Sequence, residues 1–392
     1  MKIGWIDFSK EQRGKVLSVL KLLAEPGAVD EIGIGIIRDS FADILFPGTS
    51  TIQTRAKYFF VVPYIMLELE KVKGIKQHEF LSLLDQKEVE LIDILDKDGA
   101  EGVIGVDARE SLKRKPSSIY WNALKAYGFF ANSGLTLSEY VKVFCTVRDN
   151  SQKVKSAGNN KRGNEEAADD LDSVSGLFNF WRVPIPEPTW REELTIELSK
   201  EEAAYLKQKI ITMPNTKDSL LALILRETRV DFCDYSSFDD LDTLLPVMPE
   251  AMKNDYIMAR DFANFIFGAQ IRYNIIFTKG QEEYVQEEWA AWKEDVPTID
   301  LDKLFVRLNV RNLNLMHFLK AYQNTIGNEQ ELDKLIIARE KQLKGPSRSK
   351  LVNENLYQYS GKLINMDKLY YRFYNARRIV GDIFAGAGES HA

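Results

Sequence analysis

Apolar residues recur at helical spacing along most of the chain. The clearest runs are at residues 10–24, 33–45, 77–95, 255–277 and 369–384. Apolar positions three or four residues apart lie on one face of a helix. Residues 194–198 alternate between apolar and polar positions, as a short strand does. We therefore expect a mainly α-helical protein with a minor strand component.

Capping residues indicate where several helices begin. Thr49 or Ser50 follows a Pro-Gly break and can cap a helix that runs toward residue 70. Ser199 and Glu202 have the spacing of a capping box, which predicts a helix over 200–212. Shorter apolar runs predict further helices at residues 119–127, 220–226, 238–245 and 281–302.

Residues 151–176 separate the chain into two parts. This stretch contains no aromatic residue and few large apolar ones, and a basic half is followed by an acidic half. Such a composition cannot bury enough apolar surface to form a core. We therefore expect a helical N-terminal domain at 1–150, a flexible linker or surface loop at 151–176, and a mostly helical C-terminal domain at 177–392.

The composition argues against several classes of protein. No apolar run in the 392 residues reaches the roughly 18–20 positions that a membrane span needs. The first residues lack the apolar segment of a signal peptide, so we expect a cytoplasmic protein with no membrane partner. The two cysteines and three histidines are not at metal-ligand spacing, and no phosphate-binding glycine loop occurs. We expect no metal and no cofactor.

A short basic turn precedes a well-started helix in the N-terminal half. The turn consists of Lys113, Arg114 and Lys115, and Pro116 follows it. The helix after it would present Tyr120, Trp121 and Asn122. This layout is typical of a helix-turn-helix reader of DNA, and it is equally the layout of two helices that pack without touching DNA.

The C-terminal part is basic although the whole chain has a formal net charge of −6. Residues 339–378 hold ten Lys or Arg and three Asp or Glu, so this part carries +7 and the rest −13. Cations bind phosphates, and the tyrosines between them could stack on bases. The expected contacts are Lys344, Arg348, Lys350, Arg372, Arg377 and Arg378. Alternatively, a terminal helix buries the rings and its arginines pair with the acidic stretch 281–302.

Charged and hydroxyl side chains interrupt the apolar stretch 31–63. Arg38, Asp39 and Arg55 would be costly to bury without partners, so we expect them to form one buried polar network. Alternatively, these residues, with Thr49 and Lys57, could hold a phosphate in an enzyme that acts on phosphodiesters. We assign no catalytic residue and expect a protein that is not an enzyme.

Several long motifs resemble one bacterial family. They are GWIDFS at 4–9, IGIIRDSFADILFPGTSTIQTRAKYFFVVPYI at 34–65, KRKPSSIYW at 113–121, FGAQIRYN at 267–274 and YYRFYNARRIVGDI at 370–383. The chain is similar in these motifs to the uncharacterised domain-of-unknown-function family 6361. Members of that family are found in restriction or phage-defence gene clusters beside helicases and nucleases. The resemblance implies a defence accessory and supplies no active-site residues.

Three hypotheses follow from the sequence. The first is a non-catalytic accessory that binds DNA or RNA in a bacterial defence or restriction-type system. The second is a scaffold that holds a helicase or nuclease partner, with the acidic stretch 281–302 and the proline-rich segment 184–188 as docking surfaces. The third is the phosphodiester-acting enzyme.

Overall fold

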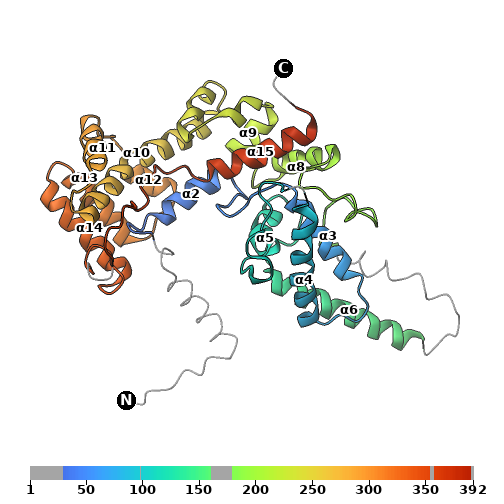
Figure 1. Ribbon diagram of the computed structural model, residues 1–392. Helices are drawn as coiled ribbons and strands as arrows, with labels where there is room; N and C mark the ends of the chain where they lie inside the picture. Colours follow the sequence, from blue (N-terminus) through green and yellow to red (C-terminus); the bar gives the residue numbers. More distant parts are fainter. Residues whose placement is uncertain (1–29, 98, 160–178, 354–356, 390–392) are drawn as a thin grey trace, which may run out of the picture. The chain divides into compact units, whose positions relative to one another are not determined.

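The structure is a computed structural model that describes residues 30–97, 99–159, 179–353 and 357–389 (Figure 1). Nearly all of its regular structure is helical. Across those ranges we find no strand, and one isolated β-bridge joins Phe130 to Trp181. The prediction of a mainly α-helical protein is confirmed.

The chain divides into two compact units. Unit 1 consists of Met1–Phe41 and Tyr256–Leu369, and unit 2 consists of Ala42–Asp255 and Tyr370–Ala392. Each unit therefore combines two segments that are far apart in the sequence. These bounds differ from the expected domains at 1–150 and 177–392, because the last helix of the chain packs within unit 2 and the residues around position 31 pack within unit 1.

Helices and 3-10 helices of unit 2 are joined mostly by short loops. They are α3 Tyr58–Glu70, α4 Gln77–Leu95, η1 Arg109–Ser111, α5 Pro116–Ala126, α6 Leu137–Asn159, α8 Lys200–Thr212, α9 Leu220–Arg226, η2 Val230–Asp234, η3 Phe238–Leu244 and α15 Phe373–Ala387. The last helix, α15, lies beside α8 (Figure 1). Aromatic rings of α3 and α5 fill the core, where Phe59 contacts Tyr120, Tyr127 and Phe129.

Unit 1 is built from α11 Glu283–Glu294, α12 Leu301–Arg307, α13 Leu313–Thr325 and α14 Glu329–Lys344. The division between the units falls within α2 Gly35–Leu45 and within α10 Glu250–Thr278. The acidic stretch 281–302, predicted as one helix, is two helices. The break occurs because Pro297 lies in it and because Asp300 caps α12, its carboxylate accepting from the amide of Lys303 at 3.0 Å.

Three predicted helices have the predicted bounds, and the start predicted at Thr49 or Ser50 is wrong. The helices at 77–95, 200–212 and 220–226 form with those bounds, and Ser199 caps α8 in the predicted box with Glu202. In contrast, α3 begins at Tyr58 rather than after Thr49 or Ser50. The hydroxyl of Thr49 donates back to the carbonyl of Phe46 at 2.6 Å, so it closes a turn instead of capping a helix.

Two other local predictions differ from the structure. Residues 194–198 alternate in burial as predicted, with Leu194, Ile196 and Leu198 buried. They form no strand, because no second segment among the described residues pairs with them. The expected linker begins as helix, since α6 continues to Asn159. Residues 160–176 and the predicted helix at 10–24 lie outside the described residues.

A buried carboxyl on α4 gives unit 2 a predicted pH dependence. Glu88 accepts from the amide of Ser117 at 2.5 Å and from its hydroxyl at 2.9 Å. Burial raises its pKa to about 7, with Asp85 adding to the shift and Ser117 and Lys115 opposing it. A carboxyl whose pKa is raised on folding stabilises the fold fully below about pH 4.5, and this contribution is lost as the pH rises through 7.

We therefore expect Glu88→Gln to gain stability relative to the wild type by on the order of 3 kcal/mol between about pH 4.5 and 8. Urea unfolding at several pH values measures this difference. The control is Glu90→Gln on the exposed face of the same helix. Parallel pH profiles for wild type and Glu88→Gln would contradict the prediction.

Candidate functional site

The charged residues of the stretch 31–63 do not form one network. Arg38 bonds its neighbour Asp39 at 3.1 Å, and both side chains are about half exposed. Arg55 instead pairs with Asp382 of α15, with Nε at 2.9 Å from Oδ1. Arg38 and Asp39 belong to unit 1 and Arg55 to unit 2. The carboxylate that Arg55 needs is supplied by the C-terminal helix rather than by Asp39.

Loop 49–56 is fastened to α15 by polar contacts. Asp382 also accepts from the backbone amide of Ala56 at 2.7 Å, so one carboxylate satisfies a guanidinium and a main-chain donor. Asn375 donates to the carbonyls of Thr51 and Gln53. These contacts fix the loop against the helix within unit 2. They leave the carboxylate of Asp382 and the amide of Asn375 occupied in holding the fold.

The side chains of the enzyme hypothesis likewise serve the fold. Lys57 lies 2.7 Å from the carboxylate of Glu202, and both are almost buried. Thr49 is buried in its turn. Each functional group therefore has an internal partner, and the arrangement presents no pair of cations directed at a common open position.

The basic turn at 113–115 does not join two α-helices. A single 3-10 turn, η1, precedes it, and the previous α-helix ends at Leu95. Tyr120 and Trp121, expected to face DNA, are buried. The Tyr120 hydroxyl donates to the carbonyl of Arg55 at 2.8 Å. Lys113 and Arg114 are exposed, whereas the ammonium of Lys115 donates to the carbonyl of Leu112.

In unit 1, the predicted cations line a buried acidic pair. Lys344 lies 3.1 Å from Glu31 and 3.2 Å from Glu340, and Lys350 lies 3.0 Å from Glu31. Burial opposes ionisation of Glu31, but the two lysines hold its pKa below the usual value. Arg348 is exposed and donates to the carbonyl of Lys344 at 3.1 Å. Lys344 and Lys350 are thus ion-pair partners inside unit 1.

In unit 2, the predicted arginines of the C-terminal region also have internal partners. Arg372 bonds Asp43 at 2.6 Å and the carbonyl of Thr49 at 2.8 Å. Arg377 donates to the carbonyl of Tyr235, and Arg378 bonds Glu101 at 2.9 Å. These partners are not in the acidic stretch 281–302. Tyr371 and Phe373 are buried, whereas Tyr374 is 44% exposed.

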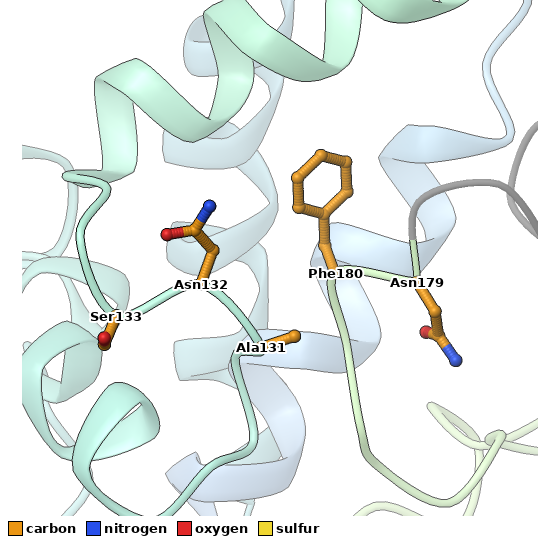
Figure 2. Close-up of a pocket in the computed structure, with 5 residues that line it drawn as sticks. All are labelled: Ala131, Asn132, Ser133, Asn179 and Phe180. Atoms are coloured by element: carbon orange, nitrogen blue, oxygen red, sulfur yellow. The ribbon is translucent and has the colours of Figure 1, made fainter.

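A hollow of about 300 Å³ opens on unit 2 where residues 131–133 meet 179–180. Figure 2 shows Asn132 and Phe180 pointing to one side of these segments and Asn179 to the other. The Phe180 ring stacks parallel to Phe130, within the aromatic core. The polar side chains that line the hollow are asparagine and serine, and none of its lining side chains is titratable. The hollow therefore carries no group for acid–base or nucleophilic chemistry.

Sequence patterns missed a helix–turn–helix pair in unit 1. α12 and α13 are joined by residues 308–312, in which Asn309 has a left-handed φ of 50° and Val310 donates to the carbonyl of Phe305 at 2.9 Å. Asn312 then caps α13 by accepting from the amide of Leu315 at 3.1 Å. Two helices joined by such a short, fixed turn are the layout that residues 109–127 were expected to have.

Most of the α12–α13 pair lies in a stretch that has basic residues and no acidic ones. Residues 303–328 contain Lys303, Arg307, Arg311 and Lys320 and no Asp or Glu. All four are exposed. Lys320 bonds Asp302 at 2.6 Å, an exposed ion pair of the kind that contributes about 0–1 kcal/mol and is easily exchanged. A count of acids along the sequence would have marked this stretch together with the longer acid-free stretch 111–138.

Two faces of α13 differ sharply. Leu315, Phe318, Leu319 and Tyr322 are buried, and the Tyr322 hydroxyl donates to the carbonyl of Phe265 on α10. On the opposite face, Leu313, Asn314, His317, Lys320 and Asn324 are exposed. Leu313 is 65% exposed, and Val306 at the end of α12 is 82% exposed. The outer face of α12–α13 therefore combines cations, amides, an imidazole and exposed apolar side chains.

The described residues contain neither a helix that could span a membrane nor a cluster of side chains that could hold a metal ion. Within the part of the chain that the structure describes, every helix is too short or too polar to cross a bilayer. Across the same residues, no three His, Cys, Asp or Glu side chains gather as a metal site requires.

Comparisons with known proteins give one match. No curated protein and no solved structure matches the chain. The resemblance noted at residues 267–274 and 370–383 lies beyond the segment that the family comparison covers. Residues 1–179 match the model of DUF6361, described as a family of unknown function, and this match supports membership of that family.

Proposed function

We propose that the protein is a non-catalytic nucleic-acid-binding accessory of a bacterial defence or restriction-type system in the cytoplasm. The defence setting follows from the family resemblance alone. The binding activity is assigned to the outer face of α12–α13. The observation that carries it is that Lys303 and Arg311 are exposed on this face, beside exposed hydrogen-bonding side chains of α13. Exposed cations can bind phosphates and release counterions, which favours binding to nucleic acid.

The outer face of α12–α13 is a better binding surface than the basic C-terminal region predicted from the sequence. Lys344 and Lys350 are held by Glu31, and Arg372 is held by Asp43. A phosphate would have to displace those carboxylates, and Lys344 is itself buried. Lys303 on α12 and Arg311 in the turn can instead meet a phosphate with only a side-chain rotation, since both are exposed.

The test is fluorescence anisotropy of labelled duplex DNA, single-stranded DNA and RNA across a range of salt concentrations. We expect affinity to fall with salt with a logarithmic slope of about −3, because each neutralised phosphate contributes about −0.9. The variant Lys303→Ala/Arg311→Ala should reduce the slope by about 2. The matched control is Lys334→Ala/Lys341→Ala, which removes two exposed lysines of α14 in the same unit.

Absence of binding to all three probes at low salt would contradict the proposal. The scaffold would then be the better hypothesis. One observation favours it specifically: Ile185, between Pro184 and Pro186, is 84% exposed. An exposed apolar side chain in a proline-rich extended segment is suited to docking in a partner's groove.

A further inference from the structure

We infer that α13 is the helix that enters the major groove of duplex DNA, so that the ligand is a double-stranded site read by its sequence. This inference rests on the proposed function and names its substrate class. α13 has 13 residues and is therefore about 20 Å long, and a major groove about 12 Å wide admits one α-helix.

The first support is that α13 is held rigidly from one side. Its four buried side chains pack into unit 1, and the rings of Tyr322 and Phe265 are 4.9 Å apart. Gln323 donates to the carbonyl of Ile299 at 2.9 Å, and Asn312 caps the first turn. A helix fixed in this way can present its outer side chains at defined positions, which sequence-specific base contacts require.

The second support is the chemistry of the outer row. Leu313, His317, Lys320 and Asn324 follow one another at intervals of four, three and four residues, so they form a single line along α13. Asn314 lies beside the start of that line. Asparagine can bond adenine through two atoms, lysine can bond guanine, and an aliphatic side chain can contact the thymine methyl.

The third support is the position of the flanking cations. Lys303 and Arg307 are on α12, and Arg311 is in the turn just before α13. In helix-turn-helix proteins the first helix crosses the phosphate backbone while the N-terminal part of the second helix contacts bases. The exposed apolar groups Val306 and Leu313 on either side of the turn would lose water on docking.

Duplex DNA fits this face better than a single strand. Proteins that bind single strands stack bases on exposed aromatic rings. The aromatic residues of α13, Phe318 and Tyr322, are both buried, and its exposed row has no Phe, Tyr or Trp. The exposed groups are hydrogen-bonding and aliphatic side chains, which read base edges in a groove.

The experiment is repeated selection of bound sequences by the full-length protein from a pool of duplexes with a random core. The wild type is expected to enrich one sequence motif and to bind it about tenfold or more tightly than random duplex. Asn314→Ala/His317→Ala is expected to lose that preference while keeping salt-dependent affinity for random duplex. The control Gln286→Ala/Gln330→Ala replaces exposed glutamines of α11 and α14 and should enrich the wild-type motif.

The outcomes separate this inference from the proposed function. If the wild type binds in a salt-dependent way but enriches no motif, α13 does not read a sequence, and the proposed nucleic-acid binding still stands. The same conclusion follows if Asn314→Ala/His317→Ala enriches the wild-type motif. Tighter binding to single strands or RNA than to duplex also overturns the inference. If the wild type binds no nucleic acid, the proposed function fails first and this inference fails with it. Thermal unfolding of each variant confirms that the protein tested is folded.

Discussion

Replacing Asp382 with asparagine is expected to lower the free energy of unfolding of unit 2 by about 3–5 kcal/mol, because it removes the buried counter-charge of Arg55 and leaves only the exposed Glu197, 3.9 Å away. The Asp382 side chain is 9% exposed and that of Arg55 is 17% exposed. Burial raises the pKa of Asp382, and the hydrogen bonds from Arg55 and Ala56 only partly offset this. For Arg55, burial works against the charge, yet pairing with Asp382 raises its pKa.

Those two directions describe a pair that contributes little net stability when intact and is costly to break. In the intact pair, the attraction between Arg55 and Asp382 offsets the free-energy cost of removing both charges from water. If one of the two is removed, the cost of burying the other is no longer offset. Asparagine keeps an oxygen that can accept from the amide of Ala56 but has no charge for Arg55. The predicted loss therefore comes from the guanidinium rather than from the main-chain contact.

Hydrogen exchange measured by mass spectrometry would localise the effect. Peptides from α3, α8 and α15 should lose protection in Asp382→Asn. Asp43→Asn is the matched control, because Asp43 also pairs with an arginine preceding α15 but is 66% exposed and should cost less than about 1 kcal/mol. Equal effects of the two substitutions would show that the Arg55–Asp382 pair has no special importance in the fold.

Local features of the fold could be predicted because their causes are local. Apolar spacing sets the helices, and the Ser199 and Glu202 capping box fixes the start of α8 within a four-residue window. The cap expected at Thr49 failed because a hydroxyl can equally close a turn on a carbonyl three residues earlier, as it does on Phe46. Only tertiary packing selects between these two local bonds.

Pairings between distant residues could not be predicted from the sequence. The partner of Arg55 is 327 positions away, and Asp39 was the nearer candidate. Charge counts failed in a similar way. The C-terminal region holds ten bases, yet Lys344, Lys350 and Arg372 pair with Glu31 and Asp43, acids from the other end of the chain. A local excess of charge does not show which cations remain exposed after folding.

The helix–turn–helix pair was predicted at residues 109–127 but forms at α12–α13, and this difference has a physical reason. Lys113 and Arg114 beside Pro116 gave a strong local signal, but the helix that follows buries Tyr120 and Trp121 in the core. The pair that forms, α12–α13, follows directly on an acidic stretch, so its cations did not stand out. Residues 303–328 contain no acid, but neither does the longer stretch 111–138, so the absence of acids alone does not single out this pair.

Replacing Glu340 with glutamine is expected to destabilise unit 1 by about 3–5 kcal/mol, because five donors converge on this fully buried carboxylate. They are the hydroxyls of Tyr273 and Ser349, the amides of Lys350 and Leu351, and the ammonium of Lys344. Glutamine removes the charge, and its side-chain amide group places two N–H donors among the five donors that now bond the carboxylate. The side chain has 0% exposure, so water cannot take the place of the lost acceptor.

The pH dependence gives this prediction a second readout. Burial opposes ionisation of Glu340, but hydrogen bonds from Leu351, Ser349 and Tyr273 and the charge of Lys344 lower its pKa overall. A lowered pKa stabilises the fold above the unfolded value of 4.5, and this stability is lost as the pH falls through the folded value. Wild-type unit 1 should therefore weaken below about pH 4.5, and Glu340→Gln should lack that part of the decline.

Glu331→Gln is the matched control on the same helix, where an exposed ion pair with Lys334 contributes little. Hydrogen exchange of peptides from α10 and α14 would measure both variants at neutral and acidic pH. If Glu340→Gln matches Glu331→Gln at both pH values, the buried carboxylate is not what joins residues 349–351 to α10 and α14. If it alone loses protection at neutral pH and converges on the wild type in acid, the carboxylate holds those segments together.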